Sequence, residues 1–307
     1  MSAKSSKAPS KGTAPSKATA ASKSPAKRQA AGRRRARETA TDAIGSYRLR
    51  QLETSRFGIV YDIDGPRVRL GVLWFFVALG CLYLGIAAVA VLFAAVAALA
   101  AAQTATVLRT KWRRPDRAVA AGVAGVVPLA AALGTGLAGA ALVVATLVAV
   151  GLAVARPQKG SDPLVDAGAV VRASLAVGLA AASVVLLYRV DIGAAVTIVL
   201  LVSAYEVGDF LVGTGAANQV EGPVSGILLM AVLTAALSVL VPPPPFEGSA
   251  IWLFAAVVAV GAPLGQVLAS AILPRAGAPA RALRRLDSYL VAAPAWLVLM
   301  WGELHLG

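Results

Sequence analysis

The sequence has little charge, one cysteine and one histidine. Only 14% of its 307 residues are charged and 58% are apolar, whereas soluble domains carry about 25% charge. This balance excludes an ordinary soluble domain and favours a membrane protein. The single cysteine, Cys81, excludes an internal disulfide, and we expect it to pack within an apolar run. The single histidine, His305, has no constellation of partners, so we expect no catalytic role for it.

The first part of the chain lacks both acidic residues and an apolar core. Residues 1–37 contain eleven Lys or Arg and no acid, among many Ala, Ser and Pro. No cleavable signal sequence is expected, because the first forty residues hold no apolar stretch. We predict that residues 1–41 form a disordered basic tail. This tail would contact anionic lipid or, as an alternative, nucleic acid, or it would only fix the topology.

Residues 42–69 are mixed in character and contain an Asp-Gly turn between two short apolar pieces. We expect a small interfacial segment there. Residues 70–307 are expected to form the transmembrane domain, because long apolar runs fill this part of the chain.

The first two apolar runs, 70–108 and 118–155, are each too long for one helix across a ~30 Å bilayer core. Basic residues flank both runs at both ends. Because basic residues favour the cytoplasmic side, each run is expected to be a hairpin of two helices. The turns are expected near Gly85 and within 134–139, so that two N-terminal hairpins occupy 70–155. The C-terminal half, 166–302, is expected to hold the spans 168–188, 194–211, 223–241, 251–273 and 288–300.

The predicted fold class is therefore an all-α polytopic membrane protein with about nine transmembrane helices and a disordered basic tail. Every cluster of Lys and Arg except the lone Arg189 falls on one predicted side. That side is expected to be cytoplasmic, together with the N-terminus. The expected location is the inner, or plasma, membrane, with the phospholipid bilayer as the first partner.

Carboxylates and arginines gather at the predicted cytoplasmic ends of the later spans. They are Glu206, Asp209, Glu221, Asp287, Arg275, Arg281, Arg284 and Arg285. Hard carboxylate oxygens suit Mg²⁺, and guanidinium groups suit phosphate oxygens. The alternative interpretation is ordinary interfacial charge with pairing between Arg and Glu.

Two of these stretches carry a family resemblance. Residues 283–288 read Leu-Arg-Arg-Leu-Asp-Ser and precede an apolar helix with Ala-Ala-Pro at 292–294. Residues 206–210 read Glu-Val-Gly-Asp-Phe, and Glu221-Gly222 opens the next span. These segments resemble the terminal signature and the preceding inward helix of the CDP-diacylglycerol synthases, also called phosphatidate cytidylyltransferases. The sequence similarity covers 203–226 and 261–301, and the topology resembles the family over 67–301.

The resemblance implies that CTP and phosphatidate are joined at the cytoplasmic face, with release of pyrophosphate. It implies catalytic carboxylates at Asp287 and Glu206, which would also be the ligands of a Mg²⁺ cofactor. Arg285 would hold phosphate, and Glu221 would orient the loop or the metal shell. The predicted substrate-binding set is completed by Arg284, Arg275 and Ser288.

The sequence also departs from the family pattern. Arg284 and Ala262 stand where the family has aspartates, and the loop before Glu221 has no lysine. Such losses remove charge stabilisation worth a few kcal/mol for each contact. The leading hypothesis is therefore a degenerate site that binds lipid or nucleotide, or a homo- or heterodimer partner of an active homologue. The alternatives are an active CTP-dependent lipid cytidylyltransferase making CDP-diacylglycerol, and a small proton-coupled transporter.

Overall fold

The computed structural model describes residues 59, 67–158, 160–216, 218–240, 246 and 250–306. The chain divides into two units, Met1–Leu49 and Arg50–Gly307, and every described residue belongs to the second. The predicted tail 1–41 and nearly all of the predicted interfacial segment before residue 67 lie outside the described residues. Both therefore stay predictions.

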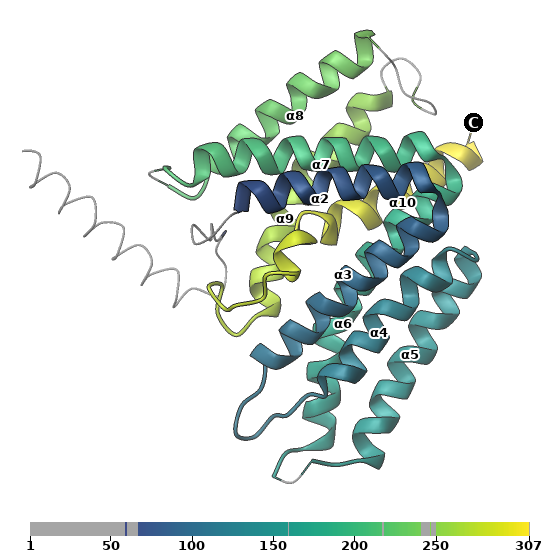
Figure 1. Ribbon diagram of the computed structural model, residues 1–307, viewed down its shortest axis with the longest axis vertical. Coiled ribbons are helices and arrows are strands. Elements are labelled where there is room, and N and C mark those ends of the chain that lie inside the picture. Colours follow the sequence, from purple (N-terminus) through teal and green to yellow (C-terminus); the bar gives the residue numbers. More distant parts are fainter. Residues whose placement is uncertain are drawn as a thin grey trace, which may run out of the picture. The chain divides into compact units, whose positions relative to one another are not determined.

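The described residues form helices joined by short loops, and no strand is found among them, which confirms the predicted all-α class (Figure 1). A short 3₁₀ helix, η1 (Leu283–Arg285), precedes the last helix. The α-helices are α2 (Arg67–Leu84), α3 (Ile86–Val107), α4 (Arg117–Ala131), α5 (Thr135–Ala155), α6 (Pro163–Val190), α7 (Ile192–Gly213), α8 (Glu221–Leu240), α9 (Ala250–Ile272) and α10 (Tyr289–Leu306).

By length and composition, six of these helices can cross a membrane: α3, α5, α6, α7, α8 and α9. Three further apolar helices, in α2, α4 and α10, are shorter. The chain is thus a multi-pass membrane protein, and the count of nine spans stays a prediction. Each predicted span from residue 168 onward coincides with a helix to within a few residues at most ends.

Each of the two long apolar runs is divided into two helices, and a glycine lies at each break. Gly85 ends α2 and precedes α3 with a φ of 106°, and Gly134 separates α4 from α5 with a φ of 154°. Positive φ values of this kind are strained for residues with a Cβ, so glycine allows the chain to reverse here. The interpretation of each long apolar run as two helices is confirmed at the level of secondary structure.

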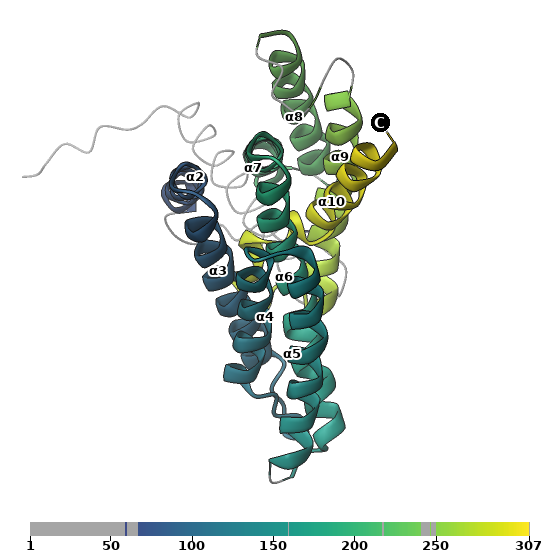
Figure 2. The same cartoon turned by 90° about the vertical axis from the view of Figure 1, so that its right-hand side faces the viewer.

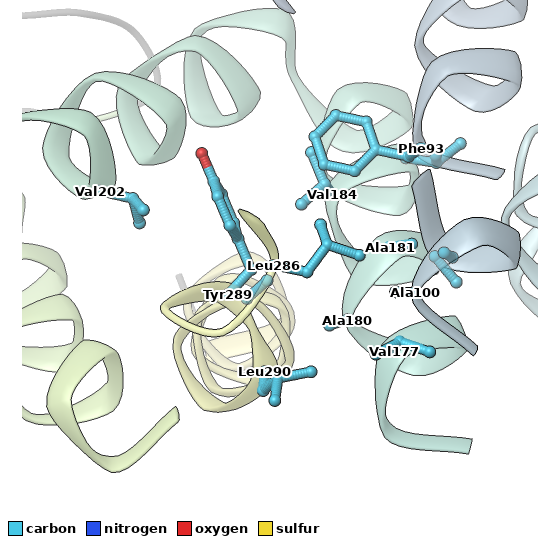
Figure 3. Packing of buried hydrophobic residues seen from close by; sticks show 14 of the residues in the cluster. Phe93, Ala100, Val177, Ala180, Ala181, Val184, Val202, Leu286, Tyr289 and Leu290 are labelled. Carbon is cyan, nitrogen blue, oxygen red and sulfur yellow. The ribbon is translucent and has the colours of Figure 1, made fainter. Parts of the chain in front are cut away.

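Small residues bring the central helices α3, α4 and α6 close together. A Cβ on Gly178 of α6 would lie 3.3 Å from the Ala124 backbone of α4, and one on Gly125 would lie 3.4 Å from Ala94 of α3. In lipid, helix association depends on such close van der Waals packing. Figure 3 shows this core from close by, where Leu286 and Tyr289 join residues of α3 and α6.

Hydrogen bonds between side chains and backbone groups connect the helix ends into two groups. At one end, Arg172 of α6 donates to the Ala271 carbonyl of α9 at 2.6 Å, and Gln103 of α3 accepts from Ala282 at 2.9 Å. We call this the basic end: it carries the loops 108–116, 156–162 and 273–288. At the opposite end, Arg189 donates to the Ala132 carbonyl at 2.6 Å. The lone Arg189 therefore lies away from the basic loops, as the charge pattern predicts.

Candidate functional site

A cavity of about 800 Å³ lies alongside α7, with walls from α2, α8 and the loop before α10. Helix α7 runs between α2 and α8 in both ribbon views (Figure 1 and Figure 2). The walls from these three helices are almost entirely apolar. The polar lining consists of Ser203, Glu206, Asp209, Gln266, Arg284, Arg285 and Asp287. The cavity thus joins an apolar groove to a charged patch near the basic end.

Glu206 and Asp209 reach this cavity because they are three residues apart on α7 and so share one helix face. Asp209 accepts a hydrogen bond from Gln266 Nε2 at 2.8 Å, and Tyr205 donates to Gln266 Oε1 at 3.1 Å. Gln266 of α9 therefore connects two residues of α7 in the interior. A buried amide in an apolar helix is costly unless its donors and acceptors are satisfied, and here both ends have partners.

Arg284 is held by the protein itself. Its Nη2 donates to the Ala276 carbonyl at 2.8 Å and to Ser270 Oγ at 3.1 Å. Its Nη1 lies 3.6 Å from Asp287 Oδ2, and both side chains are largely buried. Arg284 therefore fastens the loop 273–288 to the end of α9 and partly neutralises Asp287.

Asp287 is positioned by a close backbone contact with α9. A Cβ on Gly265 would overlap with the Asp287 carbonyl oxygen, so only glycine fits at this position of α9. Two residues later, Tyr289 packs against Phe93 of α3 with ring centroids 6.2 Å apart. The turn that carries Asp287 and Ser288 is thus pressed between α9 and the central helices.

Ser288 Oγ lies near the Glu206 carboxylate as a hydrogen-bond donor. Beyond this weak pairing, neither Ser288 Oγ nor Glu206 Oε1 has a hydrogen-bond partner among the described residues. Glu206 interacts electrostatically with Asp287, Asp209 and Arg285, so the three carboxylates act on one another. Poorly partnered polar atoms beside a cavity are costly, and a bound ligand can satisfy them.

Arg285 differs from Arg284 in its surroundings. Within the described residues its guanidinium makes no hydrogen bond and no ion pair, and it lies beside Gly71 of α2, where a Cβ would be 3.7 Å from Nη1. It lines the cavity and acts electrostatically on Glu206. A partly exposed guanidinium with unused donors is suited to a phosphate group.

Burial raises the pKa of Asp287 to about 6, and the nearby Arg284 guanidinium opposes this shift. Asp287 lies in the loop before α10, where it is 7% exposed. The desolvation cost of the carboxylate therefore outweighs its attraction to Arg284.

The carboxylates that line the cavity do not form a metal-binding set as they are positioned. Over the described residues, no group of three or more His, Cys, Asp or Glu side chains could hold a metal ion. Two of the three carboxylates are already engaged, Asp209 by Gln266 and Asp287 by Arg284. The donor set is thus unlike the octahedral oxygen shell that Mg²⁺ demands, and the Mg²⁺ cofactor stays a prediction.

Of the seven predicted site residues, four line the cavity: Glu206, Arg284, Arg285 and Asp287. Ser288 is buried beside them. Glu221 and Arg275 are not part of the lining. Glu221 begins α8, where it accepts from Asn218 Nδ2 at 2.7 Å, and Arg275 is exposed in the loop after α9.

Three further polar residues of this region were not assigned a role from the sequence. Asp209 was noted only as one of the carboxylates at this face, and Gln266 and Tyr205 were not singled out. Gln266 carries a signal in the sequence, because an amide inside an apolar span is unusual and needs a partner. That partner is visible only once α7 and α9 are packed together.

A scan against protein-family models and a search of curated proteins found no match to the chain. The family resemblance therefore rests on the quoted motifs alone.

Proposed function

We propose that the protein is a divergent, CDP-diacylglycerol synthase-like membrane protein whose cavity binds a phospholipid through its phosphate group. The observation that carries this proposal is the composition of one cavity. Its walls from α2 and α8 are apolar, and its charged patch contains Arg285, whose guanidinium makes no hydrogen bond or ion pair among the described residues. A diacyl lipid has the same division between apolar chains and a phosphate.

The apolar walls are accessible from the side. Phe76 of α2 is 64% exposed and Val232 of α8 is 66% exposed, although both line the cavity. In a bilayer these side chains face acyl chains, so a lipid can enter laterally without leaving the membrane. A phosphate drawn to Arg285 would then lie near Glu206 and Ser288. The Ser288 hydroxyl can donate to a phosphate oxygen, and the Glu206 carboxylate can accept from a protonated phosphate oxygen or a headgroup hydroxyl.

Arg284 contributes differently in this proposal. Its bonds to Ala276, Ser270 and Asp287 make it a support for the loop that presents Arg285. Residue 284, at which the chain departs from the family pattern, thereby has a structural role. This favours binding as the function, because a carboxylate at residue 284 could not make the same donor contacts.

The binding proposal is tested by native mass spectrometry of the purified full chain in detergent with phosphatidate or phosphatidylcholine. Arg285→Gln is expected to weaken phosphatidate binding about tenfold or more, because charge-assisted hydrogen bonds are lost. Arg275→Gln removes the same charge from an exposed arginine outside the cavity and is expected to leave binding unchanged. Equal binding by the wild-type protein and Arg285→Gln would contradict the proposal.

A second candidate is the active cytidylyltransferase. The observation in its favour is that Glu206, Asp209 and Asp287 line one cavity together with two arginines. Its test is release of labelled pyrophosphate and formation of CDP-lipid from CTP and phosphatidate with Mg²⁺ or Mn²⁺. Turnover that is abolished by Asp287→Asn would establish catalysis, and no turnover with either metal would exclude it.

A further inference from the structure

A second charged surface lies on the loop between α3 and α4, and none of its residues lines the cavity. Its exposed members are Arg109, Lys111, Trp112, Arg114 and Arg117, which we call the α3–α4 loop surface. The only acid within residues 109–117 is Asp116, and its carboxylate already accepts from the backbone of Ala118 and Val119 at the start of α4. The loop is therefore strongly cationic toward its surroundings.

Hydrogen bonds fix the shape of this loop. Arg113 Nε donates to the Leu108 carbonyl at 2.9 Å, and the Thr110 amide donates to the Arg113 carbonyl at 2.7 Å. The Arg114 amide donates to Asp166 of α6 at 2.5 Å, and Ser161 Oγ donates to the same carboxylate at 2.5 Å. Asp166 is buried, so a charged group is used to hold a loop backbone in place.

The basic side chains of the surface are left available by this arrangement. Over the described part of the chain, none of the four cations forms an ion pair. Lys111 lies over the Trp112 ring, 5.2 Å from its centroid. Trp112 is 70% exposed and lies between the end of α3 and the start of α4. The loop lies at the lower end of the molecule in Figure 1, next to the loop that joins α5 to α6.

We propose that the α3–α4 loop surface is a preformed docking site for anionic phospholipid headgroups in the leaflet at the basic end. Exposed tryptophan next to a helix end partitions into the headgroup region, and basic side chains at that depth attract anionic lipid. Because the loop is already shaped, little ordering entropy is lost when phosphates bind. The site is separate from the cavity, and the proposal does not depend on the function proposed for it.

The test uses the full chain in nanodiscs of phosphatidylcholine, titrated with short-chain phosphatidylglycerol and followed by native mass spectrometry. Neutralising Arg109, Lys111, Arg114 and Arg117 to Gln is expected to weaken phosphatidylglycerol binding at least tenfold. The control replaces the exposed Arg156, Arg275 and Arg281 by Gln, which removes positive charge from the other basic loops at the same end. This control is expected to change binding less than twofold.

A second variant distinguishes the effect of the loop conformation from the effect of its positive charge. Asp166→Ala makes the protein more cationic but removes the acceptor that holds the Arg114 amide, so the proposal predicts about threefold or greater weakening. Ser161→Ala, which removes one of the two donors to Asp166, provides a milder form of the same test if Asp166→Ala does not fold.

Several outcomes would overturn the proposal. They are unchanged binding in the quadruple loop variant, an equal loss in the Arg156, Arg275 and Arg281 control, and tighter binding in Asp166→Ala. Single-stranded DNA that binds the wild-type protein and loses affinity in the loop variant, with no change for phosphatidylglycerol, would assign the surface to nucleic acid instead.

Discussion

The carbonyl oxygen of Asp287 occupies the space in which a Cβ on Gly265 would have to lie. This contact holds the loop before α10 against α9 and thereby fixes the positions of Asp287 and Ser288. The absence of a side chain at Gly265 thus allows the backbone of Asp287 to approach α9. Any side chain at residue 265 must move one of the two elements.

Gly265→Ala is expected to destabilise the protein by about 1–3 kcal/mol and to abolish cavity binding of phosphatidate, because overpacking forces the backbone to shift. The matched control is Gly80→Ala, where an added Cβ meets no atom within 4 Å. Gly80 lies within α2, so the control should be neutral or slightly stabilising. Thermal unfolding followed by circular dichroism, with lipid binding, gives both readouts. Wild-type binding by Gly265→Ala would show that the contact does not position the site.

Gln266→Leu is expected to destabilise the protein by about 2–4 kcal/mol, because it removes hydrogen bonds from both Tyr205 and Asp209 in the interior. Tyr205→Phe removes one of these bonds and should cost about 1 kcal/mol. Chemical unfolding in detergent measures both values. If the two variants lose equal stability, the hydrogen bond from Gln266 to Asp209 contributes nothing to stability. That result would contradict the role of Gln266 in connecting α7 and α9.

Substitution of Arg284 and of Arg285 by Lys should have different effects on stability and on lipid binding. Arg284→Lys is expected to lower stability by about 1–3 kcal/mol, because lysine cannot reach Ala276, Ser270 and Asp287 at once. Arg285→Lys should leave stability within about 0.5 kcal/mol, since Arg285 has no such bonds among the described residues, and should weaken phosphatidate binding. A loss of stability in Arg285→Lys, with unchanged stability in Arg284→Lys, would contradict these roles.

The stability of the wild-type protein should fall as the pH rises through the pKa of Asp287. Burial raises that pKa from 3.8 to about 6, so the folded state binds a proton that the unfolded state has lost. The resulting stabilisation is fully present below about pH 4 and is lost above about pH 6, with a total on the order of 2–3 kcal/mol. The difference in melting temperature between the wild-type protein and Asp287→Asn, measured from pH 4.5 to 7.5, isolates this contribution. A difference that does not vary with pH would refute it.

The helix positions were predictable because they depend on local features. Apolar run length, flanking charge and a glycine at each turn are all visible in the sequence, and the breaks at Gly85 and Gly134 lie where these features place them. The same is true of Arg189, which the charge pattern separates from the other basic residues and which the fold places at the opposite end.

The site was predictable only in part, because its contacts join distant segments. Glu206, Arg284, Arg285 and Asp287 were identified from motifs and do line one cavity. The motif assigned both Arg284 and Arg285 to substrate binding, yet among the described residues Arg284 is held by three protein groups and Arg285 by none. Likewise, the role of Gln266 depends on partners 57 and 61 residues away. Glu221, which looks equivalent to the other carboxylates in the sequence, is used at the start of α8 instead.

The central claim, that the cavity alongside α7 binds a phospholipid, is tested most directly by photocrosslinking. A diacyl phosphatidate with a photoreactive group in one acyl chain is bound to the full chain in nanodiscs, and the labelled residues are mapped by mass spectrometry. Binding in the cavity predicts labels concentrated within residues 200–211 of α7 and 229–236 of α8, reduced by Arg285→Gln. Labels spread evenly over lipid-facing helices such as α5, with no effect of Arg285→Gln, would contradict the claim.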